Sequence, residues 1–154
     1  MQSVWQYPRP PALVPCERRV RVVLGGETIA DSVAALRVLE TSHPPTVYVP
    51  PADIAAGALR EASGTSDCEF KGRASYYDVL GGDGKVVERA AWTYHDPHPR
   101  YSALRDCVAF YPGRIDAAYL DDERVSSQLG DFYGGWITAD VTGPFKGEAG
   151  TMGW

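Results

Sequence analysis

The sequence predicts a mainly β fold with an α+β tendency, in which antiparallel β-hairpins form a compact sheet or barrel. Runs rich in β-branched and aromatic residues alternate with short stretches of turn-forming glycine, proline and aspartate. Hairpins that follow one another in sequence give antiparallel pairing, so no long crossover connection is needed. Two short helices and a C-terminal extension rich in glycine and aromatic residues complete the predicted architecture.

Three hairpins carry the fold prediction, and they are expected at residues 20–31, 76–94 and 116–125. In the first, Gly25-Gly26 separates the runs VRVVL and ETIAD. A two-residue hairpin turn favours glycine because both turn positions need positive φ. The sequence GGDG provides the second turn, and Asp121-Asp122 provides a third with weaker turn residues.

The first expected helix follows Pro50-Pro51 and continues to about residue 62. Proline suits the first turn of a helix, Asp53 complements the helix dipole, and Gly64 provides a stop. Residues 33–40 fit either a helix or a strand, and the alternation of their side chains favours the strand.

The second helix is expected at about residues 102–111, with Pro112-Gly113 as its stop. One predicted helix face carries apolar residues at i, i+3, i+4 and i+7, namely Leu104, Cys107, Val108 and Tyr111. Cys107 therefore lies on a buried stripe, where packing is a commoner role for a thiol than reactivity.

The 154 residues fit one domain, with a core at residues 20–125, an N-terminal arm at 1–19 and a C-terminal extension at 126–154. Large aromatic side chains in the extension need a surface to cover; they are Phe132, Tyr133, Trp136, Phe145 and Trp154. We therefore expect the extension to pack along the domain or across a partner subunit, and the second arrangement gives a homodimer.

Charge and composition argue against nucleic acid and membranes as binding partners. The formal net charge is −5, which argues against nucleic acid because binding to phosphates depends on lysine and arginine. No apolar run approaches the ~18 residues that span a bilayer, and the first residues lack the apolar stretch of a secretory signal, so no membrane partner is expected. The 3 cysteines form no C-x-x-C pair and fit a reducing compartment, which predicts a cytoplasmic protein.

The segment CEFKGRASYY, at residues 68–77, concentrates groups that can do chemistry. If residues 68–80 form one unbroken strand, Cys68 lies on one face and Lys71, Arg73 and Tyr77 lie on the other. Cys68 then belongs to the core and is unreactive, unless a bulge at Gly72 resets the alternation.

The face that carries Lys71, Arg73 and Tyr77 either binds an anion or simply faces water. Lys71 is the more informative of the two cations, because burial can turn a lysine into a base or a nucleophile, whereas arginine stays charged. The prediction is that any chemistry in this segment lies on the Lys71 face.

No metal and no cofactor are predicted. His95 and His98 flank an aspartate, but Pro97 and Pro99 hold this segment in an extended loop, and no third metal ligand is identifiable. The Gly-Gly pairs lack the frames of phosphate-binding loops, and no G-x-S-x-G elbow is present.

Several motifs, in the same order, resemble those of the bacterial domain-of-unknown-function family 427. The matching segments are VWQYPRPP, LRVLETSHPPTVYVP, CEFKGRASYY, AAWTY and VAFYPGRID. The core of the resemblance runs from about Val20 to Val125, and the flanking segments resemble the longer actinobacterial members. The resemblance implies a compact, mainly β domain with short helices, and it implies little about activity.

Members of that family usually carry the motif C-x-[FYW]-K-G with proline at the second position. Its cysteine, aromatic, lysine and glycine correspond to Cys68, Phe70, Lys71 and Gly72, and Glu69 stands where proline is usual. The aromatic residues of a second motif, A-W-x-Y, correspond to Trp92 and Tyr94. The resemblance thus strengthens the interest in Lys71 and in an aromatic strand beside it.

The family is sometimes labelled nucleotidyltransferase-like. That chemistry usually places a Gly-Ser turn before a D-x-D pair, so that Mg²⁺ bridges the phosphates. This chain has Asp121-Asp122 on an expected turn and contains no D-x-D pair.

The leading functional hypothesis is a cleft that binds a small anionic or polar metabolite. Lys71 and Glu40 are the predicted polar anchors and the candidate catalytic pair. Side chains predicted to bind the ligand are Tyr48, Tyr77, Trp92, Tyr94, Arg73 and His43. The alternatives are a non-catalytic module for self-association and a nucleotidyltransferase, the latter from the family label alone. The sequence leaves open whether the protein is an enzyme.

Overall fold

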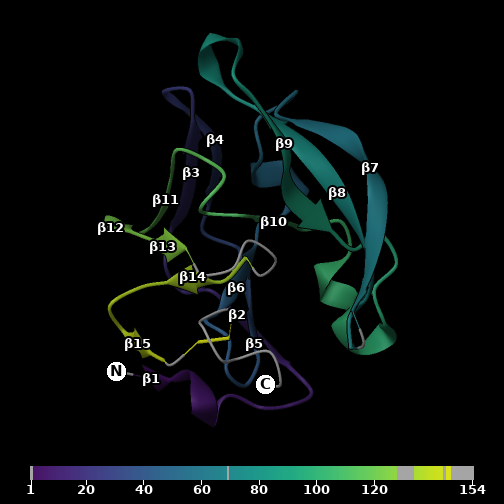
Figure 1. The fold of residues 1–154 in the computed structure, drawn as a ribbon, viewed down its shortest axis with the longest axis vertical. Helices are drawn as coiled ribbons and strands as arrows, with labels where there is room; N and C mark the ends of the chain where they lie inside the picture. Colours follow the sequence, from purple (N-terminus) through teal and green to yellow (C-terminus); the bar gives the residue numbers. More distant parts are fainter. Residues whose placement is uncertain (1, 69, 128–133, 144, 147–154) are drawn as a thin grey trace.

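The computed structural model describes residues 2–68, 70–127, 134–143 and 145–146, and short strands dominate it (Figure 1). The described strand pairs are antiparallel except for β1 (Gln2–Ser3) and β15 (Val141–Thr142), which run parallel and join the start of the chain to the C-terminal extension. The fold is mainly β, which confirms the predicted fold class.

Three sheets form the body of the molecule. On the right of Figure 1 lies a sheet of order β10-β9-β8-β7, formed by Val108–Phe110, Val86–Thr93, Gly72–Leu80 and Leu59–Cys68. On the left lies a sheet of order β12-β11-β3-β4, formed by Glu123–Arg124, Ala117–Leu120, Val20–Leu24 and Glu27–Ser32. Below them is a sheet of order β2-β5-β6, formed by Ala12–Pro15, Leu36–Leu39 and Thr46–Tyr48.

The remaining elements are small. A two-stranded pair joins β13 (Ser126–Ser127) to β14 (Trp136–Ile137). The helical elements in the described part of the chain are short 3-10 segments: η1 (Val4–Gln6), η2 (Pro51–Asp53), η3 (Gly82–Gly84) and η4 (Pro99–Leu104). Within the same residues, no helix is long and apolar enough to cross a membrane.

The three predicted hairpins are confirmed. Strands β3 and β4 pair through Gly25-Gly26, whose φ angles of 63° and 76° are the positive values that this turn requires. Strands β8 and β9 pair through η3, and β11 and β12 pair through Asp121-Asp122. The strand preferred at residues 33–40 is also present, as β5.

The helix predicted after Pro50-Pro51 is wrong, since only η2 forms there. Ile54 leaves the helical conformation and bridges Ala30, and Gly57 has a φ of 80°. From Leu59 the chain is strand β7, paired with β8. Pairing with a neighbouring strand therefore outweighs the weak local preference of the alanines for a helix.

The helix predicted at residues 102–111 is wrong as well. The 3-10 segment η4 ends at Leu104, and strand β10 follows. Val108 and Phe110 face one core cluster, whereas Cys107, Ala109 and Tyr111 face another. Because both faces of β10 are buried, the run is continuously apolar and lacks the alternation that marks a strand. Cys107 is buried, as predicted, but on a strand.

Two glycine-rich turns pack backbone against backbone and bring the two large sheets together. A Cβ on Gly25 would lie 2.1 Å from the carbonyl oxygen of Gly82, and one on Gly81 would lie 2.4 Å from that of Leu24. Asp116 holds both turns, since its carboxylate accepts hydrogen bonds from the Gly25 amide (2.8 Å) and from Lys85 Nζ (2.5 Å). The glycines of these turns thus allow the two backbones to pack closely, in addition to adopting the angles that the turns require.

The described part of the C-terminal extension packs on its own domain. Trp136 is fully buried, and its indole Nε1 donates a hydrogen bond of 3.1 Å to the carbonyl oxygen of Phe110. Phe145 packs against a small cluster at the N-terminus. Phe132, Tyr133 and Trp154 lie outside the described residues.

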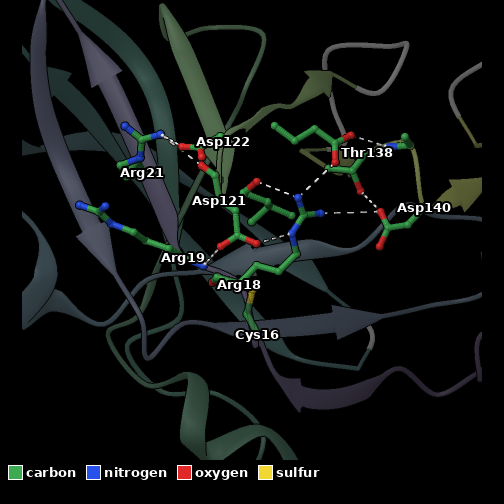
Figure 2. A network of polar contacts seen from close by, with 11 residues as sticks. Cys16, Arg18, Arg19, Arg21, Asp121, Asp122, Thr138 and Asp140 are labelled. Atoms are coloured by element: carbon green, nitrogen blue, oxygen red, sulfur yellow. Dashed lines mark hydrogen bonds and ion pairs between the residues drawn. The ribbon is translucent and has the colours of Figure 1, made fainter.

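Arg18 connects the extension to the body of the domain (Figure 2). Its guanidinium lies 3.1 Å from carboxylate oxygens of both Asp121 and Glu123, and 3.9 Å from one of Asp140. The other carboxylate oxygen of Glu123 accepts a hydrogen bond of 2.7 Å from the amide of Ala139. Arg18 and Glu123 therefore hold residues 139–140 close to the β11–β12 turn.

The neighbouring arginines are also paired with aspartates. Arg19 bonds Asp31 at 2.5 Å, and Arg21 lies 3.4 Å from Asp122 (Figure 2). The amide of Arg19 holds the pKa of Asp121 below its ordinary value, with a further contribution from Arg18. Arg18, Arg19 and Arg21 thus form ion pairs with acidic residues of the same chain.

The packed turns give a stability prediction. Gly81→Ala is expected to lower the free energy of unfolding by about 2–3 kcal/mol, because the new methyl group overlaps the backbone of Leu24. Gly84→Ala is the matched control: its φ of 70° is strained, but nothing lies within 4 Å of the added Cβ, so the cost is about 1 kcal/mol. Urea denaturation measures both values, and an equal loss in the two variants would show that the turns do not depend on close approach.

Candidate functional site

A cavity of about 270 Å³ lies between the β10-β9-β8-β7 sheet and the β2-β5-β6 sheet. Six aromatic side chains contribute to its walls: Tyr48, Phe70, Tyr76, Trp92, Tyr94 and Tyr111. Its polar lining comes mainly from Glu40, His43, Ser66, Asp67, Cys68, Lys71 and Lys146. Of the residues predicted from sequence, the cavity brings together Glu40, His43, Tyr48, Lys71, Trp92 and Tyr94.

Lys71 reaches the cavity because the chain reverses direction beside it. The unbroken strand predicted at residues 68–80 is wrong: β7 ends at Cys68, β8 begins at Gly72, and these two residues are paired. The amide of Lys71 donates a hydrogen bond to the Cys68 sulfur at 3.4 Å. Cys68 and Lys71 therefore line the same cavity, where the predicted alternation had separated them.

The loop that contains Pro97 fixes this reversal. The amide of His98 donates a hydrogen bond of 2.9 Å to the carbonyl oxygen of Lys71. Gly72 has a φ of 115°, and a Cβ at this position would lie 3.4 Å from the carbonyl oxygen of Asp96. Glycine is needed here because other residues rarely adopt this φ.

Arg73 and Tyr77 lie away from the cavity, which corrects their assignment to the Lys71 face. The Arg73 side chain is 70% exposed and pairs with Asp67 at 3.2 Å. Tyr77 packs against the opposite core cluster and meets the ring of His95 edge-on, with ring centroids 6.3 Å apart. Arg73 and Tyr77 alternate with Ala74 and Tyr76, which line the cavity, whereas Lys71 reaches the cavity because it lies in the turn between Cys68 and Gly72.

Lys71 and Glu40 form the central polar contact of the cavity. Lys71 is 8% exposed, and its Nζ lies 3.7 Å from Glu40 Oε1. The Glu40 side chain is 21% exposed. Because an ammonium group is costly to bury without a counter-charge, Glu40 is the residue that permits this position for Lys71.

His43 lies beside this pair. Its Nδ1 donates a hydrogen bond of 2.9 Å to the carbonyl oxygen of Thr41, which leaves the lone pair of the neutral ring at Nε2. Burial lowers the pKa of His43, and the positive charges of Lys146 and Lys71 lower it further, against opposing effects of Thr41 and Glu40. His43 is therefore a neutral side chain at pH 7.

Three aromatic residues on the cavity wall are linked through their polar atoms. Trp92 Nε1 donates a hydrogen bond of 3.3 Å to the hydroxyl of Tyr48, and the two rings meet edge to face at 87°. The rings of Tyr48 and Tyr94 are 6.2 Å apart. Burial raises the pKa of both phenols, and the thiol of Cys68 contributes to the rise for Tyr94. Both hydroxyls thus stay protonated at neutral pH.

The extension closes one side of the cavity. A Cβ on Gly134 would lie 2.3 Å from the Trp92 ring, so only glycine allows the chain to pass this close. The same Cβ would lie 3.2 Å from the Tyr111 ring, which packs against Trp92 with ring centroids 4.6 Å apart. The roles of Gly134 and Lys146 are not predicted from sequence, because no local pattern signals a contact between the extension and the cavity.

The other polar motifs of the sequence lie outside the cavity. His95 Nδ1 is 2.7 Å from Asp106, and the His98 ring accepts a hydrogen bond from the amide of Arg100. Asp121 and Asp122 pair with arginines. Among the residues that the structure describes, no three His, Cys, Asp or Glu side chains converge as metal ligands.

A family model described as a domain of unknown function, DUF427, and labelled NTP_transf_9, matches residues 12–121. The chain belongs to this family. No curated protein matches it. The DUF427 match includes Glu40, Lys71 and the aromatic wall, whereas Gly134 and Lys146 lie beyond it.

The cavity gives a prediction for the cysteines that revises the sequence-based one. Cys68 is half-buried on the cavity wall, while Cys16 and Cys107 are buried, and burial raises the pKa of the Cys107 thiol. We expect iodoacetamide to modify Cys68 in the native protein roughly tenfold or more faster than the other two thiols. Peptide mapping by mass spectrometry measures the three rates, with Cys68→Ser as the control. Modification of Cys107 at the rate of Cys68 would contradict the assignment of these walls.

Proposed function

We propose that this DUF427 protein binds a small anionic metabolite in the cavity, with Lys71 as its cationic anchor. The observation that carries the proposal is a lysine 8% exposed, at 3.7 Å from Glu40, inside an aromatic-walled cavity. Aromatic walls combined with convergent polar groups are typical of a small-molecule site.

The geometry of the ion pair supports a binding role. A separation of 3.7 Å is longer than a hydrogen bond, so ammonium protons of Lys71 are left for another acceptor. An anionic group that entered the cavity would accept these protons in a partly desolvated setting, where charge-assisted hydrogen bonds are strong. The protonated hydroxyls of Tyr48 and Tyr94 add neutral donors on the same wall.

The same residues supply the means for proton transfer if the bound molecule reacts. Glu40 and Lys71 form an acid–base pair within one contact, and neutral His43 is beside them. Binding is the proposed function, and this pair is the proposed catalytic group for any reaction that follows binding.

Two further observations agree with the proposal. A module used only for self-association predicts Lys71 in open solvent, and Lys71 is instead buried. The described part of the C-terminal extension packs on its own chain, which favours a ligand site within one subunit. Cys16, Cys68 and Cys107 are free thiols, and we propose a cytoplasmic location on that ground.

Lys71→Met tests the proposal with benzoate and benzamide as probes of equal size and different charge. Wild-type protein is expected to bind millimolar benzoate more tightly than benzamide, and Lys71→Met is expected to lose roughly tenfold or more in benzoate affinity by calorimetry. Removing the ammonium also leaves Glu40 without its partner, so the free energy of unfolding should fall by about 1–3 kcal/mol.

Lys85→Met is the matched control, because it removes a lysine that is 46% exposed and lies outside the cavity. Its benzoate affinity should equal that of wild type. Equal affinity for benzoate and benzamide in the wild-type protein, or unchanged benzoate affinity in folded Lys71→Met, would overturn the proposed function.

A further inference from the structure

A small side chain, that of Ala74 on β8, interrupts the aromatic wall of the cavity. Ala74 is 4% exposed and lies on the same face of the strand as Tyr76, since both residues line the cavity. On the neighbouring strand, Trp92 is the register partner of Tyr76. A methyl group among these large rings leaves space that a larger side chain at position 74 would fill.

The rings around this space are held in place by polar contacts. The hydroxyls of Tyr76 and Ser66 lie 2.8 Å apart, and Ser66 is the register partner of Ala74 on β7. The Trp92 ring is fixed as well, because its Nε1 donates a hydrogen bond to the hydroxyl of Tyr48. A binding surface that is already ordered costs little conformational entropy when a ligand binds. The wall is therefore preformed for a ligand that makes its contacts with aromatic rings.

The volume of the cavity limits the size of that ligand. At about 270 Å³, it lies just below the range of ~300–1,000 Å³ that is usual for small-molecule sites. It is larger than an engineered cavity of ~150 Å³ that binds benzene. The space therefore suits a single six-membered ring with a short substituent. A nucleoside triphosphate, with its base, sugar and phosphate chain, is too large to be enclosed in it.

We propose that the cavity selects planar, single-ring aromatic acids over aliphatic acids, and that Ala74 leaves the space which the ring occupies. This inference rests on the proposed function, in which Lys71 binds the acidic group. An aromatic ligand gains edge-to-face or offset contacts with wall rings such as Trp92 and Tyr94, in addition to the area that it buries. A saturated ring of similar size is puckered and gains only the buried area. Ring geometry therefore determines which acid binds, while Lys71 provides the anchor.

Benzoate, cyclohexanecarboxylate and acetate separate ring selection from charge, because each carries one negative charge at neutral pH. By calorimetry, wild-type protein is expected to bind benzoate roughly threefold to tenfold more tightly than cyclohexanecarboxylate. Hydrophobic burial alone would give the opposite order, because the saturated ring is the more apolar of the two. Acetate has no ring, and its weaker binding is followed by NMR titration of the Lys71 side chain. Adenosine triphosphate should not displace benzoate.

Ala74→Leu places a larger side chain in the proposed ring space. It should reduce benzoate affinity roughly tenfold or more and change acetate affinity by less than about twofold. Ala74→Val adds less volume and should cause a smaller loss of benzoate affinity in the same direction. Ala34→Leu is the matched control, since Ala34 is exposed and lies outside the cavity, and it should bind both probes as wild type does. Lys71→Met should weaken benzoate and acetate alike.

The results that contradict ring selection differ from those that contradict the anchor. If wild-type protein binds cyclohexanecarboxylate as tightly as benzoate, or if adenosine triphosphate displaces benzoate, the proposed ligand class is wrong while Lys71 remains the anchor. Unchanged benzoate affinity in the folded Ala74 variants, or an equal loss for acetate, would overturn the role of Ala74. If Lys71→Met leaves both affinities unchanged, the proposed function itself fails. Circular dichroism establishes that each variant is folded, and the comparison of probes on wild-type protein needs no variant.

Discussion

The burial of one ammonium group is the constraint on which the site depends. Lys71 leaves solvent because the chain reverses between Cys68 and Gly72, and the amide of His98 holds its carbonyl oxygen at 2.9 Å. A charge in this position needs a counter-charge, and Glu40 provides it from the end of β5. The pairing of β7 with β8 and the position of β5 are thus coupled through two side chains.

Local turn chemistry explains why part of the fold could be predicted from the sequence. Gly25-Gly26 and the GGDG turn contain residues with positive φ. Glycine and aspartate adopt such angles readily, so the two hairpin turns can be predicted from residue type alone. The helix expected at residues 102–111 failed because β10 is buried on both faces, so its apolar run had no alternation to reveal a strand. The glycines also allow the two turns to pack together, and no local pattern predicts such a contact between distant segments.

Only part of the candidate site could be predicted from the sequence, because several of its residues meet through contacts between distant segments. Lys71 was singled out by its residue type and its motif, and Tyr48, Trp92 and Tyr94 come from strands that pack near it. Arg73 and Tyr77 do not share a face with Lys71, because Lys71 lies in the turn between β7 and β8, where the alternation of a strand does not apply. Lys146 was missed because the extension reaches the cavity through tertiary packing alone. Lys71 lies within the residues that the DUF427 model matches, whereas Gly134 lines the cavity from the C-terminal extension.

The most direct test of an anion site at Lys71 is an NMR titration with benzoate, followed at the ε-methylene groups of the assigned lysine side chains. An anchor at Lys71 predicts that its signal shifts and saturates with the affinity measured by calorimetry, while the signal of exposed Lys85 stays in place. A Lys71 signal that does not move, or that drifts linearly together with that of Lys85, would contradict a site built around this ammonium group.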